Sequence, residues 1–237
     1  MKVLKTVVGG PVVQQFLYTN ICIHEEDGYI VRKAKNSIRG SYNHWIRDPV
    51  RALQVTIGCN FSDGGYFVTL TFSDETLPVT REQVSRRFWY FTHKLKRMGY
   101  PVRYIKNIEH RHGAGRWHMH CIIAGPPQEA IRSAWHYGHV HIRPIILRDV
   151  FPNPENVQYQ GGGLANYMVK ELREKPGQRL FQCSRGLKRP EATRQLVDDE
   201  YYLTAPGGCL FIEKNEPVVN NYGSSARITY LLPPSGN

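Results

Sequence analysis

Hydrophobic and polar residues alternate with a period of two in several segments of the chain. Alternation of this kind over about four to eight residues is typical of a strand with one buried face. The pattern predicts strands at residues 66–72, 102–109, 117–124 and 139–146. Glycine, proline, serine and aspartate flank these segments, as expected for strands that are joined by turns.

Between the strands, the spacing of apolar residues changes to that of an α-helix. Thr80, with Gln83 three residues later, forms a capping box that opens a helix predicted to run to Gly99. Further helices are predicted over 126–137 and 164–174. The order strand, helix, strand, strand, helix, strand predicts an α+β fold. We expect an antiparallel central sheet with helices on one face, in the ferredoxin-like split-βαβ arrangement.

The two ends of the chain have less regular patterns. Short β-prone pieces and a basic stretch make up residues 1–60, and further β-like pieces lie in a setting rich in proline and glycine towards the C-terminus. We therefore expect three parts. Residues 1–60 form an N-terminal extension without an assigned role, 61–195 hold the predicted sheet, and 196–237 form a β-rich C-terminal tail packed on that core.

The charge balance favours a nucleic acid as the partner. The 237 residues include 31 lysines and arginines against 20 aspartates and glutamates, a net charge of +11, and 11% of residues are aromatic. The five cysteines form no CxxC pair, which argues against a disulfide framework or a thiolate zinc site. No apolar stretch approaches the roughly 20 residues that span a bilayer. With no secretory signal either, we expect a cytoplasmic protein without a membrane partner.

Two histidines lie one residue apart within the apolar segment 117–124. Side chains at i and i+2 of a strand point to the same face, so the imidazoles of His118 and His120 can approach one cation. The intervening apolar residues fall on the opposite face, which a helix would cover. The alternative is a chance or structural pair, since the chain has ten histidines and His139-Val-His141 repeats the spacing.

Glu109 is the expected third ligand. A two-residue turn at Gly113-Ala114, which suits type II′ geometry, pairs Glu109 with His118 on one face of a hairpin. In that register His110 and His112 point the other way. Two imidazoles and one carboxylate form an open site of mixed nitrogen and oxygen ligands, which suits Mn²⁺ or Mg²⁺ in catalysis.

The helix predicted over 164–174 offers a nucleophile. Tyr167 has Lys170 at i+3, on the same helical face. Because a free tyrosine has a pKa of about 10, a nearby ammonium group would favour its phenolate form. Taken alone, the pair is also what an ordinary amphipathic helix presents to solvent.

Three short motifs occur in an informative order. The apolar strand Phe67–Phe72, the histidine pair His118 and His120, and Tyr167 with Lys170 resemble the motifs of the HUH endonucleases that initiate rolling-circle replication. The similarity is greatest to replication-associated proteins of small single-stranded DNA phages and of plasmids. It identifies residues 61–195 as the endonuclease domain.

The resemblance covers about residues 60–190 and has two departures. Glu109 and Arg116 stand where that group has its glutamate and arginine, but the glycine expected after the glutamate is displaced. Many phage relatives have two tyrosines on the motif-three helix, and here Gly163 stands where the first would fall. We therefore expect a single nucleophile, with Tyr159 as a weaker candidate for a second.

The resemblance implies a metal-assisted transesterification. Tyr167 would attack a phosphodiester held by a divalent ion on Glu109, His118 and His120, and Lys170 would assist. The products would be a 5′-phosphotyrosine link and a free 3′-hydroxyl that primes synthesis. The implied partners are single-stranded or extruded DNA at a replication origin, a separate helicase and a DNA polymerase, in a bacterial host. The chain agrees in having no GxxxxGK[ST] motif of a P-loop ATPase.

Basic residues outside the predicted metal site are expected to contact DNA phosphates. These are Arg116 and, in the SRGLKRP stretch, Arg185, Lys188 and Arg189. A simple solvated loop explains the stretch equally well. Two further readings of the whole chain stay open: a transposase or relaxase with the same chemistry, and a non-catalytic single-stranded nucleic-acid-binding protein with structural histidines.

Overall fold

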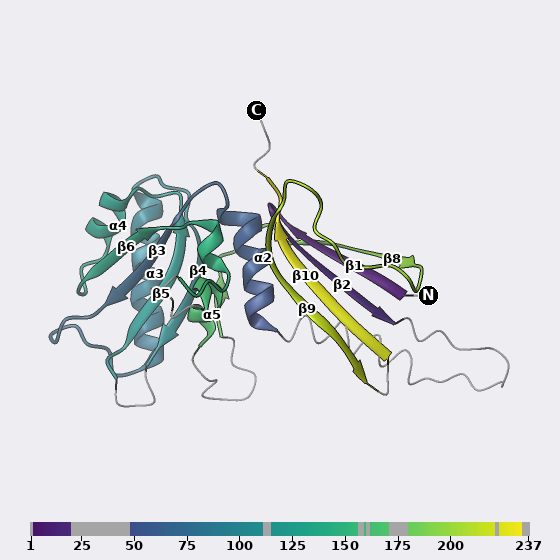
Figure 1. Cartoon of the computed structure of the whole chain (residues 1–237). Helices are drawn as coiled ribbons and strands as arrows, with labels where there is room; N and C mark the ends of the chain where they lie inside the picture. The colour runs from purple at the N-terminus through teal and green to yellow at the C-terminus, as the bar shows by residue number, and fades with distance from the viewer. Residues whose placement is uncertain are drawn as a thin grey trace, which may run out of the picture. The chain divides into compact units, whose positions relative to one another are not determined.

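In the computed structural model the chain divides into two compact units. One joins Met1–Asn60 with Lys188–Asn237, and the other is Phe61–Leu187. Each has its own five-stranded antiparallel sheet (Figure 1). The structure describes residues 2–19, 48–110, 115–155, 159, 162–170, 180–220 and 223–233.

The sheet of the 61–187 unit has the strand order β6-β3-β5-β4-β7. Its strands are β3 (Tyr66–Thr71), β4 (Arg103–Glu109), β5 (His118–Ala124), β6 (Val140–Pro144) and β7 (Gln182–Cys183). Helix α3 (Arg81–Arg97) connects β3 to β4, and α4 (Gln128–Ala134) connects β5 to β6. This is the predicted α+β fold with an antiparallel sheet, and its connectivity is that of a split βαβ unit.

The capping box predicted for the first helix is present. Thr80 is the N-cap of α3, and its side chain accepts a hydrogen bond from the backbone N–H of Gln83 at 3.3 Å. The Gln83 side chain in turn accepts from the backbone N–H of Val79 at 2.9 Å. The helix ends before Gly99, whose φ of +89° suits the residue that follows a helix C-terminus.

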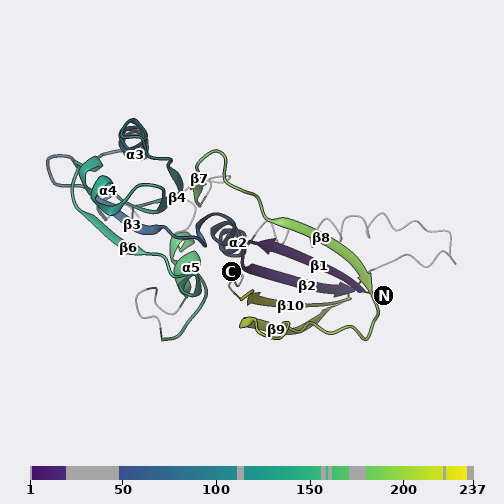
Figure 2. The same ribbon diagram turned by 90° about the horizontal axis from the view of Figure 1, so that it is seen from above.

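Both faces of the central strands are buried. On one face, Val68 and Leu70 belong to a core cluster with residues of α3 and α4. On the other face, Phe67 contacts the ring of Tyr167, which lies on α5 (Gly163–Val169). Figure 2 shows α3 and α5 on opposite sides of the sheet.

The prediction that helices cover one face therefore holds for α3 and α4, whereas α5 covers part of the second. The reason lies in the strands themselves, because the paired residues Phe67, Ile105 and Ile122 form an apolar patch there. An apolar patch of this kind is stable only when another element covers it.

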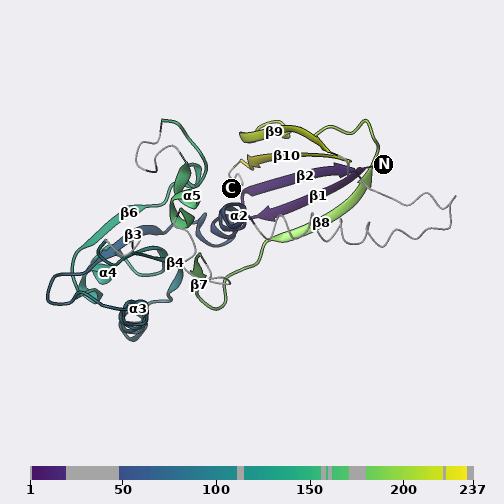
Figure 3. The same ribbon diagram turned by 90° about the horizontal axis from the view of Figure 1, so that it is seen from below.

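The other unit is built from both ends of the chain (Figure 3). Its strand order is β8-β1-β2-β10-β9. The strands are β1 (Lys2–Gly9), β2 (Val12–Thr19), β8 (Glu191–Val197), β9 (Leu210–Asn220) and β10 (Gly223–Leu231). Segments that the sequence analysis treated as separate, the N-terminal extension and the C-terminal tail, thus share one sheet.

Helix α2 (Pro49–Phe61) was not predicted, and it lies close to this sheet. A Cβ atom on Gly9 would lie 2.3 Å from the carbonyl oxygen of Val55, and one on Gly58 would lie 2.1 Å from the carbonyl oxygen of Gly9. Glycine at both positions therefore allows the helix backbone to contact the strand backbone. Among the described residues, none of the helices has the length and apolar character that crossing a membrane requires.

Candidate metal centre and active site

The register between β4 and β5 places a carboxylate directly opposite a histidine. Glu109 pairs with His118, and Asn107 pairs with His120, so all four side chains lie on one face. The loop that joins the strands, with the predicted turn at 113–114, lies outside the described residues. The predicted facing positions of Glu109 and His118 are confirmed.

His110 lies away from this group, as the register predicts. Its ring stacks on Trp117 with 3.8 Å between ring centroids, and Trp117 belongs to the core cluster under α3 and α4. His112 lies outside the described residues. The alternation along the hairpin therefore separates a polar face from an apolar one.

Three ligand-type side chains converge on the polar face. Oε2 of Glu109 lies 2.9 Å from Nε2 of His120 and 3.3 Å from Nε2 of His118. The candidate ligand atoms all lie within 4.8 Å of one another. Across the part of the chain that the structure describes, no other three such side chains come together in this way, and His139 and His141 do not contribute to one.

The far side of each imidazole is also held. Nδ1 of His118 donates a hydrogen bond to the backbone carbonyl of Arg116 at 3.1 Å, and Nδ1 of His120 is hydrogen-bonded to Thr69 Oγ1 at 3.1 Å. These contacts orient both rings so that Nε2 faces Glu109. Contacts of this kind fix which nitrogen of a histidine is available to a metal.

The three groups shift one another's protonation. Burial alone would raise the pKa of Glu109, but hydrogen bonds and charges from the two histidines outweigh it and hold that pKa well below its usual range. Burial acts against the charged form of His118, yet its bonds to Glu109 and to the Arg116 carbonyl raise its pKa. Burial dominates at His120 and lowers its pKa. The site therefore combines an ionised carboxylate with an imidazole that stays neutral at pH 7.

This donor set fits a divalent cation. Glu109 and His120 are only 1% and 3% exposed, and a carboxylate oxygen with two imidazole nitrogens is a ligand set that suits Mn²⁺ and accepts Mg²⁺. Because three ligands leave coordination positions open, a substrate oxygen has room to bind. The group could bind a metal, as the sequence predicted.

Helix α5 brings further chemistry to the same face. Asn107 Nδ2 donates a buried hydrogen bond to the carbonyl of Met168 at 2.7 Å, which fastens the helix to β4. The helix begins at Gly163, whose φ is +77° and whose Cβ, if present, would lie 2.4 Å from the carbonyl oxygen of Phe151. A side chain such as the first tyrosine of the phage relatives therefore cannot be accommodated at this position.

The structure brings Tyr167 and Lys170 together with the candidate metal ligands. The Tyr167 ring lies edge-on to His120, with 5.0 Å between ring centroids, and is half-buried. Nζ of Lys170 lies 3.7 Å from the centroid of the Tyr167 ring and 3.3 Å from Glu109 Oε2. Residues that are about 60 positions apart in the chain therefore form one cluster.

Tyr159 is a poor second nucleophile. It is 5% exposed, and its ring packs at 5.9 Å from both Phe67 and Tyr167, centroid to centroid. Burial raises the pKa of Tyr159 to about 12, because the phenolate form is disfavoured away from water. The geometry suits a packing role beside Tyr167.

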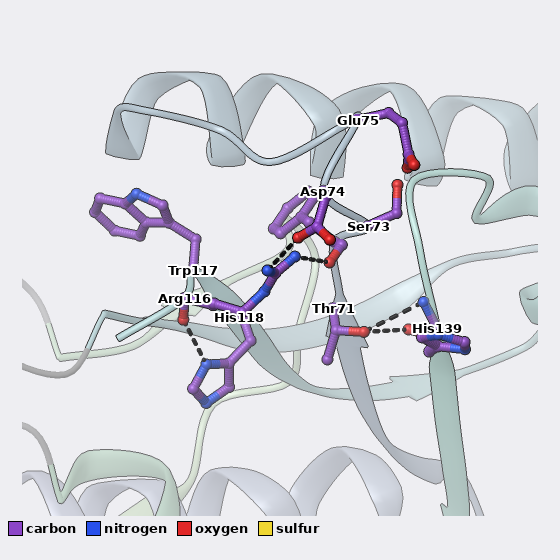
Figure 4. Close-up of a pocket in the computed structure, with 9 residues that line it drawn as sticks. Thr71, Ser73, Asp74, Glu75, Arg116, Trp117, His118 and His139 are labelled. Carbon is purple, nitrogen blue, oxygen red and sulfur yellow. Dashed lines mark hydrogen bonds and ion pairs between the residues drawn. The ribbon is translucent and has the colours of Figure 1, made fainter. Parts of the chain in front are cut away.

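A pocket of about 440 Å³ opens beside His118 (Figure 4). The predicted DNA contact Arg116 lies in its wall, where its guanidinium forms an ion pair with Asp74 and donates to the carbonyl of Phe72 at 3.0 Å. His139 lines the opposite side of the pocket. Arg116 is therefore held in place next to the candidate metal centre.

The other predicted phosphate contacts are exposed but divided between the units. Arg185 belongs to residues 61–187, whereas Lys188 and Arg189 belong to the other unit. The backbone N–H of Lys188 donates to Asn60 Oδ1 at 2.8 Å. The stretch is thus anchored at Lys188, and its charged side chains face solvent.

Sequence analysis did not single out two polar residues that support the site. Thr69 orients His120, and Asn107 anchors the backbone of Met168. A signal was available for one of them, since Asn107 precedes Glu109 by two residues and must share its face of the strand. Thr69 gave no such signal, because its contact depends on which strand pairs with β5.

The fold and this site together point to a protein that acts on nucleic acid. Residues 65–172 match the model of a family of replication-associated proteins, described by its member ORF2. The matched segment includes every residue of the Glu109, His118, His120, Tyr167 and Lys170 cluster. No curated protein and no solved structure shows a significant match to the chain. The family match confirms the resemblance to replication-associated proteins and indicates a role in the initiation of replication.

Proposed function

We propose that this protein initiates rolling-circle replication by nicking single-stranded or extruded origin DNA through a tyrosine transesterification. The observation that carries the proposal is the convergence of Tyr167 and Lys170 on the Glu109, His118 and His120 group, within a segment that matches replication-associated proteins. A nucleophile, a cation and a candidate metal centre are the groups that phosphoryl transfer needs.

Glu109 Oε2 and the Nε2 atoms of His118 and His120 would hold the divalent ion. When bound, a Mn²⁺ or Mg²⁺ ion stabilises negative charge on the oxygens of a scissile phosphate. Thr69 and the Arg116 carbonyl would keep both imidazoles aimed at the site. The protein thus contributes ligands that are already oriented before DNA binds.

Tyr167 would supply the reacting atom. Its hydroxyl oxygen forms a bond to phosphorus while the bond from phosphorus to the 3′ oxygen breaks. The phenol loses its proton, and the departing 3′ oxygen gains one. Since one phosphodiester replaces another, the step needs no ATP and leaves a 5′-phosphotyrosine and a free 3′-hydroxyl. Lys170, beside the ring, would favour the phenolate and the charged phosphate.

DNA binding would draw on the net charge of +11 and on specific cations. Arg116 is positioned beside His118, and Arg185, Lys188 and Arg189 are exposed for phosphate contacts. Binding that depends on such contacts weakens steeply with salt. A helicase to open the duplex and a polymerase to extend the 3′-hydroxyl would be separate proteins.

The first prediction is that Tyr167→Phe abolishes covalent adduct formation. Phenylalanine keeps the ring and its packing but lacks the only atom that attacks phosphorus. Wild-type protein is incubated with Mn²⁺ and a pool of random single-stranded oligonucleotides labelled at the 3′ end, and covalent protein–DNA bands are measured on a denaturing gel. Wild type forms the band, and Tyr167→Phe binds the DNA but forms none.

Tyr159→Phe is the matched control and retains the adduct. Mass spectrometry of the wild-type band maps the nucleotide to Tyr167. An adduct on Tyr159, or one that persists in Tyr167→Phe, contradicts the assignment. DNA binding without any adduct in the wild type favours the non-catalytic binder.

A further inference from the structure

Lys170 and the two histidines share a single oxygen atom. Oε2 of Glu109 lies 2.9 Å from His120 Nε2, 3.3 Å from His118 Nε2 and 3.3 Å from Lys170 Nζ. The carboxylate is 1% exposed, so these nitrogens provide most of its charge compensation. The ammonium of Lys170 thus lies where a cation is needed by a buried carboxylate.

We propose that Lys170 and the divalent ion compete for Glu109, so that metal binding releases Lys170 towards Tyr167 and the substrate phosphate. The inference rests on the proposed function, since it concerns the same metal centre. It assigns Lys170 a second role, that of a built-in cation which balances Glu109 until a metal replaces it.

Electrostatics makes the two occupants mutually exclusive. A carboxylate oxygen offers two lone pairs, and three nitrogens already converge on Oε2 of Glu109. A divalent ion on that oxygen would also stand a few ångströms from the Lys170 ammonium. Repulsion between like charges at that distance in a partly buried site amounts to several kcal/mol at an effective dielectric constant of about 20. One of the two must therefore leave, and only the lysine side chain is flexible.

Lys170 has somewhere to go. It is the residue after the last turn of α5 (Gly163–Val169), and its side chain is 29% exposed. Its Nζ already lies 3.7 Å from the centroid of the Tyr167 ring. Released from Glu109, the ammonium remains next to the phenol and is free to contact a phosphate. Metal loading and the availability of the lysine are thereby linked.

The proposal predicts effects of opposite sign on metal affinity and on cleavage. Lys170→Met removes the competing cation, so Mn²⁺ binds about tenfold more tightly, as expected when one charge-assisted hydrogen bond no longer has to be broken. The same variant cleaves DNA more slowly. A lysine that only supports the structure, or that helps to hold the metal, would instead weaken Mn²⁺ binding when removed.

The test is a titration of the DNA-free protein with Mn²⁺, in which electron paramagnetic resonance measures the free ion. Lys170→Met and Lys170→Gln are expected to bind about tenfold more tightly than the wild type. Lys170→Arg keeps the charge and is expected not to gain affinity. Lys96→Met removes an exposed lysine of α3 outside the site and controls for net charge. Circular dichroism confirms that each variant is folded.

Equal or weaker Mn²⁺ binding by both Lys170→Met and Lys170→Gln would overturn the proposal. So would a gain of the same size in Lys96→Met, because net charge would then explain it. Since no DNA is present, the titration does not depend on nicking. A wild type that binds Mn²⁺ but forms no DNA adduct removes the proposed function and leaves the competition intact.

Discussion

Lys106 carries its charge into the apolar side of the sheet. The residue lies on β4, is 6% exposed, and its Nζ is 4.6 Å from the centroid of the Phe88 ring on α3. Burial lowers its pKa to about 8, with the neighbouring thiol of Cys121 acting in the opposite direction and Arg81 in the same one. The folded protein therefore bears a cost for keeping this side chain protonated at neutral pH.

We predict that Lys106→Met stabilises the protein at pH 7 by about 1–3 kcal/mol, the cost of a pKa lowered from 10.5 to about 8 less the lost contact with Phe88. Between pH 8 and 10.5 the unfolded chain binds the proton and the folded chain does not, so wild-type stability rises with pH there. The advantage of the variant should shrink across the same window. Denaturant unfolding at pH 7 and pH 10.5 measures it.

Lys96→Met, on the exposed side of α3, serves as the control and should change stability by less than about 0.5 kcal/mol. A destabilised Lys106→Met protein at pH 7 would show that the ammonium contributes more than its burial costs.

The candidate ligands were predictable because their contacts are local. A two-residue turn and the period of a strand were enough to pair Glu109 with His118 and to align His120 beside it. The contact between Lys170 and Glu109 was not predictable. It depends on how α5 docks on β4, and docking is decided by buried side chains from other elements. Sequence spacing within one helix contains no information about that.

At the scale of elements, α5 depends on a glycine that tolerates neither a side chain nor a change of conformation. Gly163 has φ +77°, and a Cβ there would lie 2.4 Å from the Phe151 carbonyl oxygen. We predict that Gly163→Ala destabilises the protein by about 2–4 kcal/mol through backbone strain and displacement of the helix. Adduct formation should fall by more than tenfold, because Tyr167 moves away from the metal centre. Thermal unfolding and the gel assay measure the two effects.

Gly99→Ala separates strain from crowding. Gly99 also has a positive φ, +89°, but nothing lies within 4 Å of a Cβ built there. Its alanine variant should lose about 1 kcal/mol and keep full adduct formation. Equal losses in both variants would mean that the contact with Phe151 is unimportant for α5.

The strands and the first helix followed from periodicity and capping, whereas the placement of α5 did not. Alternation predicted one buried face for each strand, yet Phe67, Ile105 and Ile122 bury the second face as well. A short apolar run is compatible with burial on one face or on both. The difference decides whether a helix has a surface to cover, and it becomes visible only when the strands are paired.

At the scale of the whole molecule, the unit that holds the candidate site is inserted into the other unit. Strand β1 pairs with β8, and β2 pairs with β10, so Lys2 lies opposite Val197 and Val12 opposite Leu231. Alternation identifies such segments as strands but does not reveal partners nearly 200 residues away. For this reason the sequence suggested separate terminal segments where the structure has one sheet.

Two separate cores predict two unfolding transitions. One apolar cluster joins the β3–β6 sheet to α3 and α4, and another, built around Leu4, Val13 and Tyr230, belongs to the terminal unit. Because the candidate ligands lie only in the 61–187 unit, Mn²⁺ should raise the midpoint of one transition and leave the other unchanged. At a Mn²⁺ concentration of 100 times Kd the gain is about 2.7 kcal/mol, or roughly 10 °C.

Differential scanning calorimetry with and without Mn²⁺ measures both midpoints, and Glu109→Gln supplies the control. Glutamine fills the same volume but lacks the charge that binds the ion, so neither transition should respond to Mn²⁺ in this variant. A single transition in the wild type would show that the two units unfold together. A Mn²⁺ shift that persists in Glu109→Gln would place the metal elsewhere, because the ion would then stabilise the fold without this carboxylate.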